Sequence, residues 1–94
     1  MTNIFNRNKY FNLLYSMLER ETETQAFEAW AMIEDYKYDY LEKRLNRSER
    51  NYLITQVVFN YFILKQRIKN GELPVFMSFR FYANELNYTE SEYI

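Results

Sequence analysis

The sequence predicts an all-α fold, a compact bundle of three long helices followed by a short C-terminal helical segment. The chain has 94 residues but only one glycine and one proline, the residues that most often interrupt helices. Apolar residues recur at three- and four-residue spacing along most of its length. A chain this short buries only about 60–65% of its unfolded surface, so we expect one domain spanning residues 1–94.

The first helix is expected at about residues 6–20, where polar and apolar residues fall on opposite sides of a helical projection. Its apolar side carries Tyr10, Leu13, Leu14, Met17 and Leu18. A second helix is expected at about 24–45, and Thr22 followed by Gln25 has the form of a capping box at its start.

The apolar stripe of the second helix bends. Its early face carries Ala26, Trp30 and Ile33, whereas Tyr38 and Leu41 line up with Phe27. This shift predicts that the two halves of the helix contact different neighbours.

The third helix, at about 47–69, is apolar on two sides. Asn46 followed by Glu49 resembles an N-terminal cap, and Asn70-Gly71 is a typical helix stop. Such a helix is buried on both sides, either by the run VFMSFRFY at 75–82 or by a second copy of the chain. The second apolar side, which is a possible dimer face, carries Tyr52, Phe59, Phe62 and Ile63.

The last twenty residues fit a strand or a helix. A helix at about 78–86 is favoured, because a lone strand would have no partner. Residues 83–94 resemble the middle of a helix-turn-helix motif, with Thr89 capping a new helix and Glu92 at the capping-box position. The heart of the core is predicted to contain Leu14, Leu18, Trp30, Ile33, Val57, Tyr61 and Leu64.

Composition excludes most catalytic chemistry. Without histidine or cysteine there is no imidazole or thiolate for nucleophilic catalysis or zinc binding, and one glycine cannot build a phosphate-binding loop. We therefore expect no enzyme, no cofactor and no metal. The absence of cysteine, of a signal peptide and of a membrane-spanning run predicts a cytoplasmic protein.

Two charged clusters are candidate sites. Asp35, Tyr36, Asp39 and Tyr40 lie in an acidic, tyrosine-rich stretch that would suit a protein partner; the alternative is a solvated helix face. Arg44, Arg47 and Arg50 surround the expected start of the third helix, where an anion or nucleic acid would offset their unfavourable position.

The leading functional hypothesis is a non-catalytic protein-binding module that covers a surface of a larger protein. Residues of AT-rich codons are abundant, which suggests an inhibitor or modulator from a phage or mobile element. One alternative is a dimeric nucleic-acid-binding regulator that uses the arginines, although a net charge of −1 makes nucleic acid a less favoured partner. Another is a structural subunit of a larger assembly.

Overall fold

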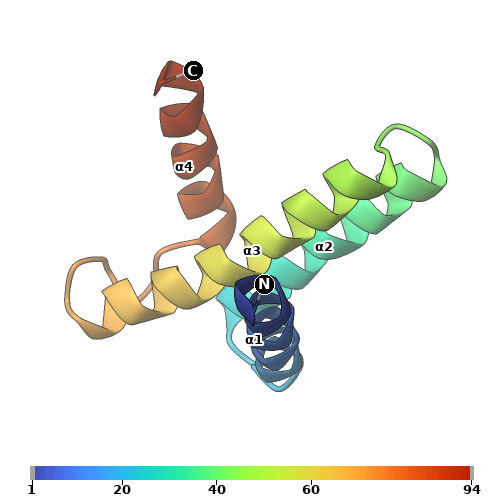
Figure 1. The fold of residues 1–94 in the computed structure, drawn as a ribbon. Coiled ribbons are helices and arrows are strands. Elements are labelled where there is room, and N and C mark those ends of the chain that lie inside the picture. Colours follow the sequence, from blue (N-terminus) through green and yellow to red (C-terminus); the bar gives the residue numbers. More distant parts are fainter. Residues whose placement is uncertain (1, 94) are drawn as a thin grey trace.

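The computed structural model describes the backbone of residues 2–93 and the side chains of residues 9–86. It contains four helices in the described part of the chain: α1 (Thr2–Glu19), α2 (Thr24–Leu41), α3 (Arg47–Lys69) and α4 (Phe79–Tyr93) (Figure 1). The predicted all-α fold, with three long helices and a shorter C-terminal one, is confirmed. No described helix has the length and the hydropathy that crossing a membrane requires.

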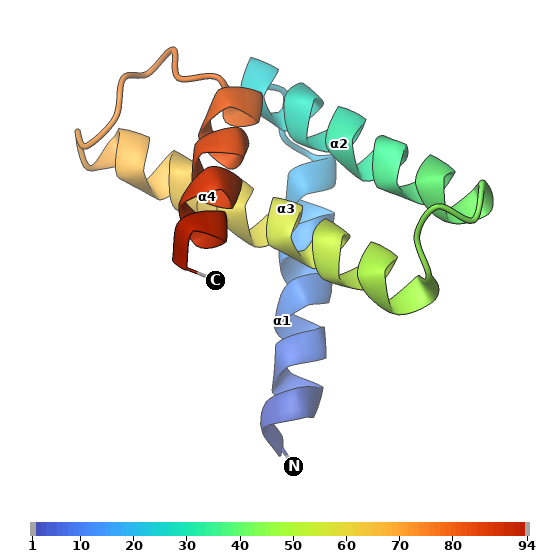
Figure 2. The same cartoon turned by 90° about the horizontal axis from the view of Figure 1, so that it is seen from above.

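The helices are arranged in three layers. α2 and α3 lie side by side and run in opposite directions, joined by the short turn at 42–46 (Figure 1). α1 crosses this pair on one side and α4 packs on the other, as the view from above shows (Figure 2). The α2–α3 pair is therefore the middle layer, and each of its broad sides has only one helix to cover it.

The core lies between the layers and contains most of the residues predicted for it. Leu14, Leu18, Ile33, Val57, Tyr61 and Leu64 are buried. Trp30 is only partly buried; its indole N–H donates to the carbonyl oxygen of Leu18 at 3.3 Å. α4 adds Phe79, which is fully buried and whose ring centroid lies 6.1 Å from that of Tyr61.

α2 ends at Leu41, four residues earlier than predicted, because the chain turns at Lys43. Lys43 has a φ of 61°, a left-handed conformation, and the N–H of Arg44 donates to the carbonyl oxygen of Asp39 at 2.8 Å. These are the features of a Schellman C-cap, which normally uses glycine at the left-handed position. The sequence has lysine there, so the end of the helix was not recognisable.

The predicted second stripe of α2 does not meet a neighbour. Phe27 is 61% exposed, Tyr38 56% and Leu41 73%. The stripe through Phe27, Tyr38 and Leu41 therefore faces outward. The prediction that this stripe contacts a neighbour of its own is wrong, although Tyr36 and Tyr40 of the same half do pack against the rest of the fold.

One predicted cap is confirmed and one is wrong. The Asn46 side chain accepts from the Glu49 N–H at 2.8 Å, and the Glu49 carboxylate accepts from the Asn46 N–H at 2.9 Å. At the start of α2 the N-cap is instead Glu23, whose side chain makes no capping hydrogen bond. The Gln25 amide, predicted to take part in a capping box, donates to the loop before α4. Gly71, with a φ of 78°, ends α3 as predicted.

α4 begins where predicted but continues to Tyr93 rather than ending near residue 86. No glycine or proline interrupts residues 79–93, so the helix runs through the position at which a helix-turn-helix motif would turn. The resemblance to that motif does not extend to the backbone.

The strained C-cap of α2 gives a direct test of the fold. Replacing Lys43 by glycine should stabilise the protein by about 1 kcal/mol, because glycine adopts positive φ without steric cost. The melting temperature should rise by about 4–8 °C. Lys43→Ala removes the same charge but keeps the strain, so equal melting temperatures for the two variants would contradict this C-cap.

Candidate protein-interaction site

Two side chains of α2 hold the loop that leads into α4. The Gln25 amide nitrogen donates to the carbonyl oxygens of Val75 at 3.1 Å and Met77 at 3.0 Å. One oxygen of Glu28 accepts from the Ser78 hydroxyl at 2.6 Å, and its other oxygen accepts from the backbone N–H of Phe79 at 3.1 Å. Residues 75–79, called the anchor loop below, are thus bound to α2 along their length.

The anchor loop presents an aromatic side chain to solvent. Phe76 is 88% exposed, although the carbonyl groups on either side of it are both bound by Gln25. Val75 is 76% exposed. A large apolar side chain on a restrained backbone has little conformational entropy left to lose on binding, apart from its own rotamers.

Part of the predicted acidic site lies on the same side of α2 as the anchor loop. Asp35 is exposed and follows Glu28 by seven residues, which places both on one helix face. Tyr36 is half-buried; burial raises the pKa of its hydroxyl, Asp35 raises it further, and Arg80 of α4 partly opposes them. The first turn of α4 therefore lies near Tyr36.

The other part of the predicted acidic site meets the predicted arginine cluster at the α2–α3 turn. Asp39 forms an ion pair with Arg44, with 3.4 Å between the charged atoms. The guanidinium carbon of Arg50 lies 4.3 Å from the centroid of the Tyr40 ring, a cation–π contact. Asp39, Tyr40, Arg44 and Arg50 therefore each have a partner within the chain.

The start of α3 is less open to an anion than the sequence suggests. The backbone N–H of Glu49, which an anion would use, already donates to Asn46. Arg50 also donates to the Asn51 side chain at 2.8 Å, whereas Arg47 is exposed and has no partner among the described residues. Nucleic-acid binding through these arginines stays a prediction.

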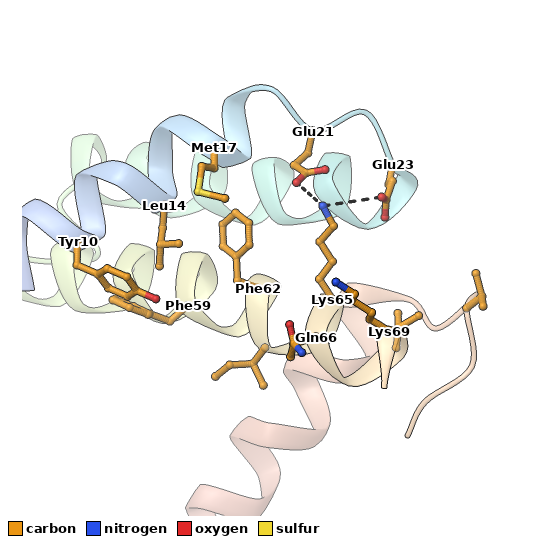
Figure 3. Close-up of a pocket in the computed structure, with 13 residues that line it drawn as sticks. Tyr10, Leu14, Met17, Glu21, Glu23, Phe59, Phe62, Lys65, Gln66 and Lys69 are labelled. Carbon is orange, nitrogen blue, oxygen red and sulfur yellow. Dashed lines mark hydrogen bonds and ion pairs between the residues drawn. The ribbon is translucent and has the colours of Figure 1, made fainter. Parts of the chain in front are cut away.

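A groove of about 910 Å³ opens where α1 crosses the C-terminal half of α3 (Figure 3). The ring of Phe62 points from α3 toward Met17 of α1, and Tyr10 lies against Phe59 with ring centroids 5.8 Å apart. Most of the lining is apolar: Tyr10, Leu14, Met17, Phe59, Phe62, Ile63, Ile68 and Val75.

The charges of this groove are gathered at one end. Lys65 of α3 reaches Glu21 with a hydrogen-bonded ion pair and lies 4.0 Å from a carboxylate oxygen of Glu23 (Figure 3). Lys69 is exposed one turn further on. Apart from Gln66, the remainder of the groove lining is apolar.

The groove contains most of the possible dimer face. Phe59, Phe62 and Ile63 line it; Tyr52 lies outside it, 59% exposed, with its hydroxyl accepting from the Gln56 amide at 2.6 Å. Of the two alternatives for this face, cover by the 75–82 run is wrong except at Val75, because the first turn of α4 packs on the other side of the α2–α3 pair.

Sequence reasoning missed several residues of these surfaces. Tyr10, Leu13 and Met17 of α1 were expected in its packed side but are 54%, 57% and 41% exposed. Gln25 and Glu28 were not singled out for binding the loop, since their partners lie about fifty residues away. The adjacency of Val75 and Phe76 to the only proline, Pro74, was the one local signal of an apolar loop.

The described residues include no group of three or more acidic side chains placed to hold a metal ion. No protein-family model matches the chain, and no curated protein or solved structure is significantly similar to it. Function is therefore argued from the geometry of these surfaces.

The hydrogen bonds from Glu28 to the anchor loop, called the clamp below, predict that two glutamates of α2 contribute unequally to stability. Glu28→Ala should lower the free energy of unfolding by about 1–2 kcal/mol, because it removes the acceptor for the first N–H of α4 and for Ser78. Glu34→Ala is the matched control, since Glu34 forms only an exposed ion pair with Lys37 and should cost under about 0.5 kcal/mol. Urea denaturation measures both values, and equal losses would refute the clamp.

Proposed function

We propose that this chain is a non-catalytic protein-binding module that occupies a surface of a larger cytoplasmic protein. The observation that carries the proposal is Phe76, 88% exposed on a loop that α2 holds in place. An inhibitor or modulator encoded by a phage or mobile element is the kind of protein this describes. Such proteins need a rigid contact surface rather than a reaction centre.

The energetic advantage of the anchor loop is that its backbone is ordered before binding. Association costs free energy for each loop and side chain that becomes fixed, and a preordered loop avoids much of that cost. Interfaces obtain most of their binding energy from a few residues, often aromatic, that enter a pocket of the partner. Phe76 meets these conditions because it is large, apolar and almost free of intramolecular contact.

Asp35 and Tyr36 lie about two turns further along α2 than Glu28, which holds the anchor loop. Asp35 is exposed on the side of α2 that holds the loop, and Tyr36 has its ring partly in the core. A carboxylate on the same side of α2 as an apolar anchor favours a partner that places a basic group beside an apolar pocket, since complementary charge speeds encounter and fixes orientation. Asp39 and Tyr40 support this surface indirectly, through the α2–α3 turn.

The test is affinity capture from the cells that produce the protein, with wild-type and variant chains immobilised at equal density. Phe76→Ala should lower the affinity for the captured partner at least thirtyfold, the effect of losing roughly 2 kcal/mol at an interface anchor. Phe27→Ala, which removes an exposed phenylalanine from the outer side of α2, should leave capture unchanged. Both variants should keep wild-type melting temperatures.

Asp35→Lys adds a second, charge-specific arm to this experiment. It should weaken capture at low salt and have a smaller effect at high salt, where charges beyond about one Debye length are screened. Capture of the same proteins at the same affinity by wild-type and Phe76→Ala would overturn the proposed site.

A further inference from the structure

We propose that a second copy of this chain occupies the groove between α1 and α3, so that the functional unit is a homodimer. The proposal goes beyond the partner-binding surface at the anchor loop and does not depend on it. It rests on the area that the chain leaves exposed, on the shape of the groove face and on the distribution of charge along that face.

The single chain exposes more surface than its mass predicts. Its accessible area is 7150 Å² at 11.7 kDa, whereas a compact monomer of that mass exposes about 5,900 Å². Its radius of gyration is 13.9 Å, against about 12 Å for a compact chain of this length. The difference of about 1,250 Å² exceeds the roughly 800 Å² that each partner buries in a standard stable interface.

Several of the exposed apolar side chains lie together on the groove face, whereas those of the outer side of α2 and of the anchor loop lie elsewhere. Leu13 and Met17 of α1 are 57% and 41% exposed, and Ile63 of α3 is 48% exposed. Met17 and Ile63 both line the groove, and Leu13 lies one helical turn from Met17 on the same helix. Neighbouring exposed apolar side chains of this kind are typical of a surface that binds another molecule.

The shape of this face suits a copy of itself. A two-fold interface uses the same patch on both subunits, so that patch must provide both a projection and a recess. Here α1 forms a ridge that crosses the α2–α3 pair and extends beyond it, and the groove lies immediately beside that ridge (Figures 2 and 3). In a two-fold dimer the α1 ridge of each chain lies in the groove of the other.

The chain has no segment of its own, among the described residues, that covers the groove. α4 is held on the opposite side by the hydrogen bonds of Ser78 and Phe79 to Glu28 and by the burial of the Phe79 ring beside Tyr61. Val75 of the anchor loop reaches only one end of the groove. The apolar centre remains open until another molecule covers it.

Charge favours a second copy over a highly charged partner such as nucleic acid. The net charge of −1 imposes little repulsion between two chains. Lys65, the cation within the groove nearest to its apolar centre, is already neutralised by Glu21 and Glu23. The groove therefore offers an apolar contact with locally paired charges at its end, as expected where a homodimer interface meets solvent.

Dimerisation would also present two anchor loops on one particle. A partner with two binding sites, or two partners in one assembly, would then be held by avidity without any new contact. Phe76→Ala is expected to leave the dimer intact, so loss of partner capture and loss of dimerisation are separate outcomes.

The mass of the purified protein, measured by sedimentation equilibrium over a wide concentration range, tests the proposal. The wild-type chain should have twice the 11.7 kDa monomer mass. Ile63→Glu and Leu13→Glu should each raise the dimer dissociation constant at least thirtyfold, the effect expected at a buried interface residue. Both positions are about half-exposed in the single chain, so helical content by circular dichroism should not change.

Phe27→Glu is the matched control, because Phe27 is an exposed apolar residue on the outer side of α2, away from the groove. It should remain dimeric. A wild-type chain that is monomeric at every concentration would overturn the proposal. Dimers of Ile63→Glu and Leu13→Glu as stable as the wild type, or equal dissociation by Phe27→Glu, would overturn its placement in the groove.

Discussion

The two hydrogen bonds between the Glu28 carboxylate and the first turn of α4 determine which side of the α2–α3 pair α4 covers. One carboxylate accepts from both the Ser78 hydroxyl and the Phe79 N–H, and this holds the start of α4 against α2. The Phe79 ring is then fully buried beside Tyr61. Because α4 lies on that side of the α2–α3 pair, the opposite side has only α1 to cover it, and the anchor loop must pass over the start of α2.

α1 covers its side incompletely because it crosses the α2–α3 pair instead of running along it (Figure 2). Leu14 and Leu18 enter the core, and Tyr15 packs edge-on against Trp30 with ring centroids 5.1 Å apart. A crossing helix touches its neighbours over only part of its length, so its apolar stripe is longer than its contact. The surplus apolar surface on α1 and the open groove on α3 thus have one geometric cause.

The features that local chemistry determines could be predicted from the sequence. Scarce glycine and proline with helical periodicity predicted the helices, and the pairs at Asn46 and Gly71 marked the ends of α3 correctly. The end of α2 was missed because its left-handed residue is Lys43, which has no propensity signal for that conformation. The spacing of Thr22 and Gln25 predicts a capping box, but the Gln25 amide has its partners about fifty residues away along the chain.

For the candidate surfaces, the sequence could predict which residues share a face but not whether that face is covered. The pattern showed that α3 is apolar on two sides, and Phe59, Phe62 and Ile63 do lie on one face. Periodicity gives the direction of an apolar side relative to its own helix, but it does not say which neighbour covers it. That depends on the Glu28 contact across the fold, as does the exposure of Phe76.

Isotope-filtered NOE spectroscopy on a mixture of ¹³C-labelled and unlabelled chains tests most directly whether a second copy covers the groove between α1 and α3. Intermolecular NOEs from the Ile63 methyl groups to Leu13 or Met17 of the other chain are the expected result, since these side chains are exposed on one face of the monomer. A filtered spectrum with no NOE to the Ile63 methyl groups, at concentrations where the mass is measured, would contradict the dimer.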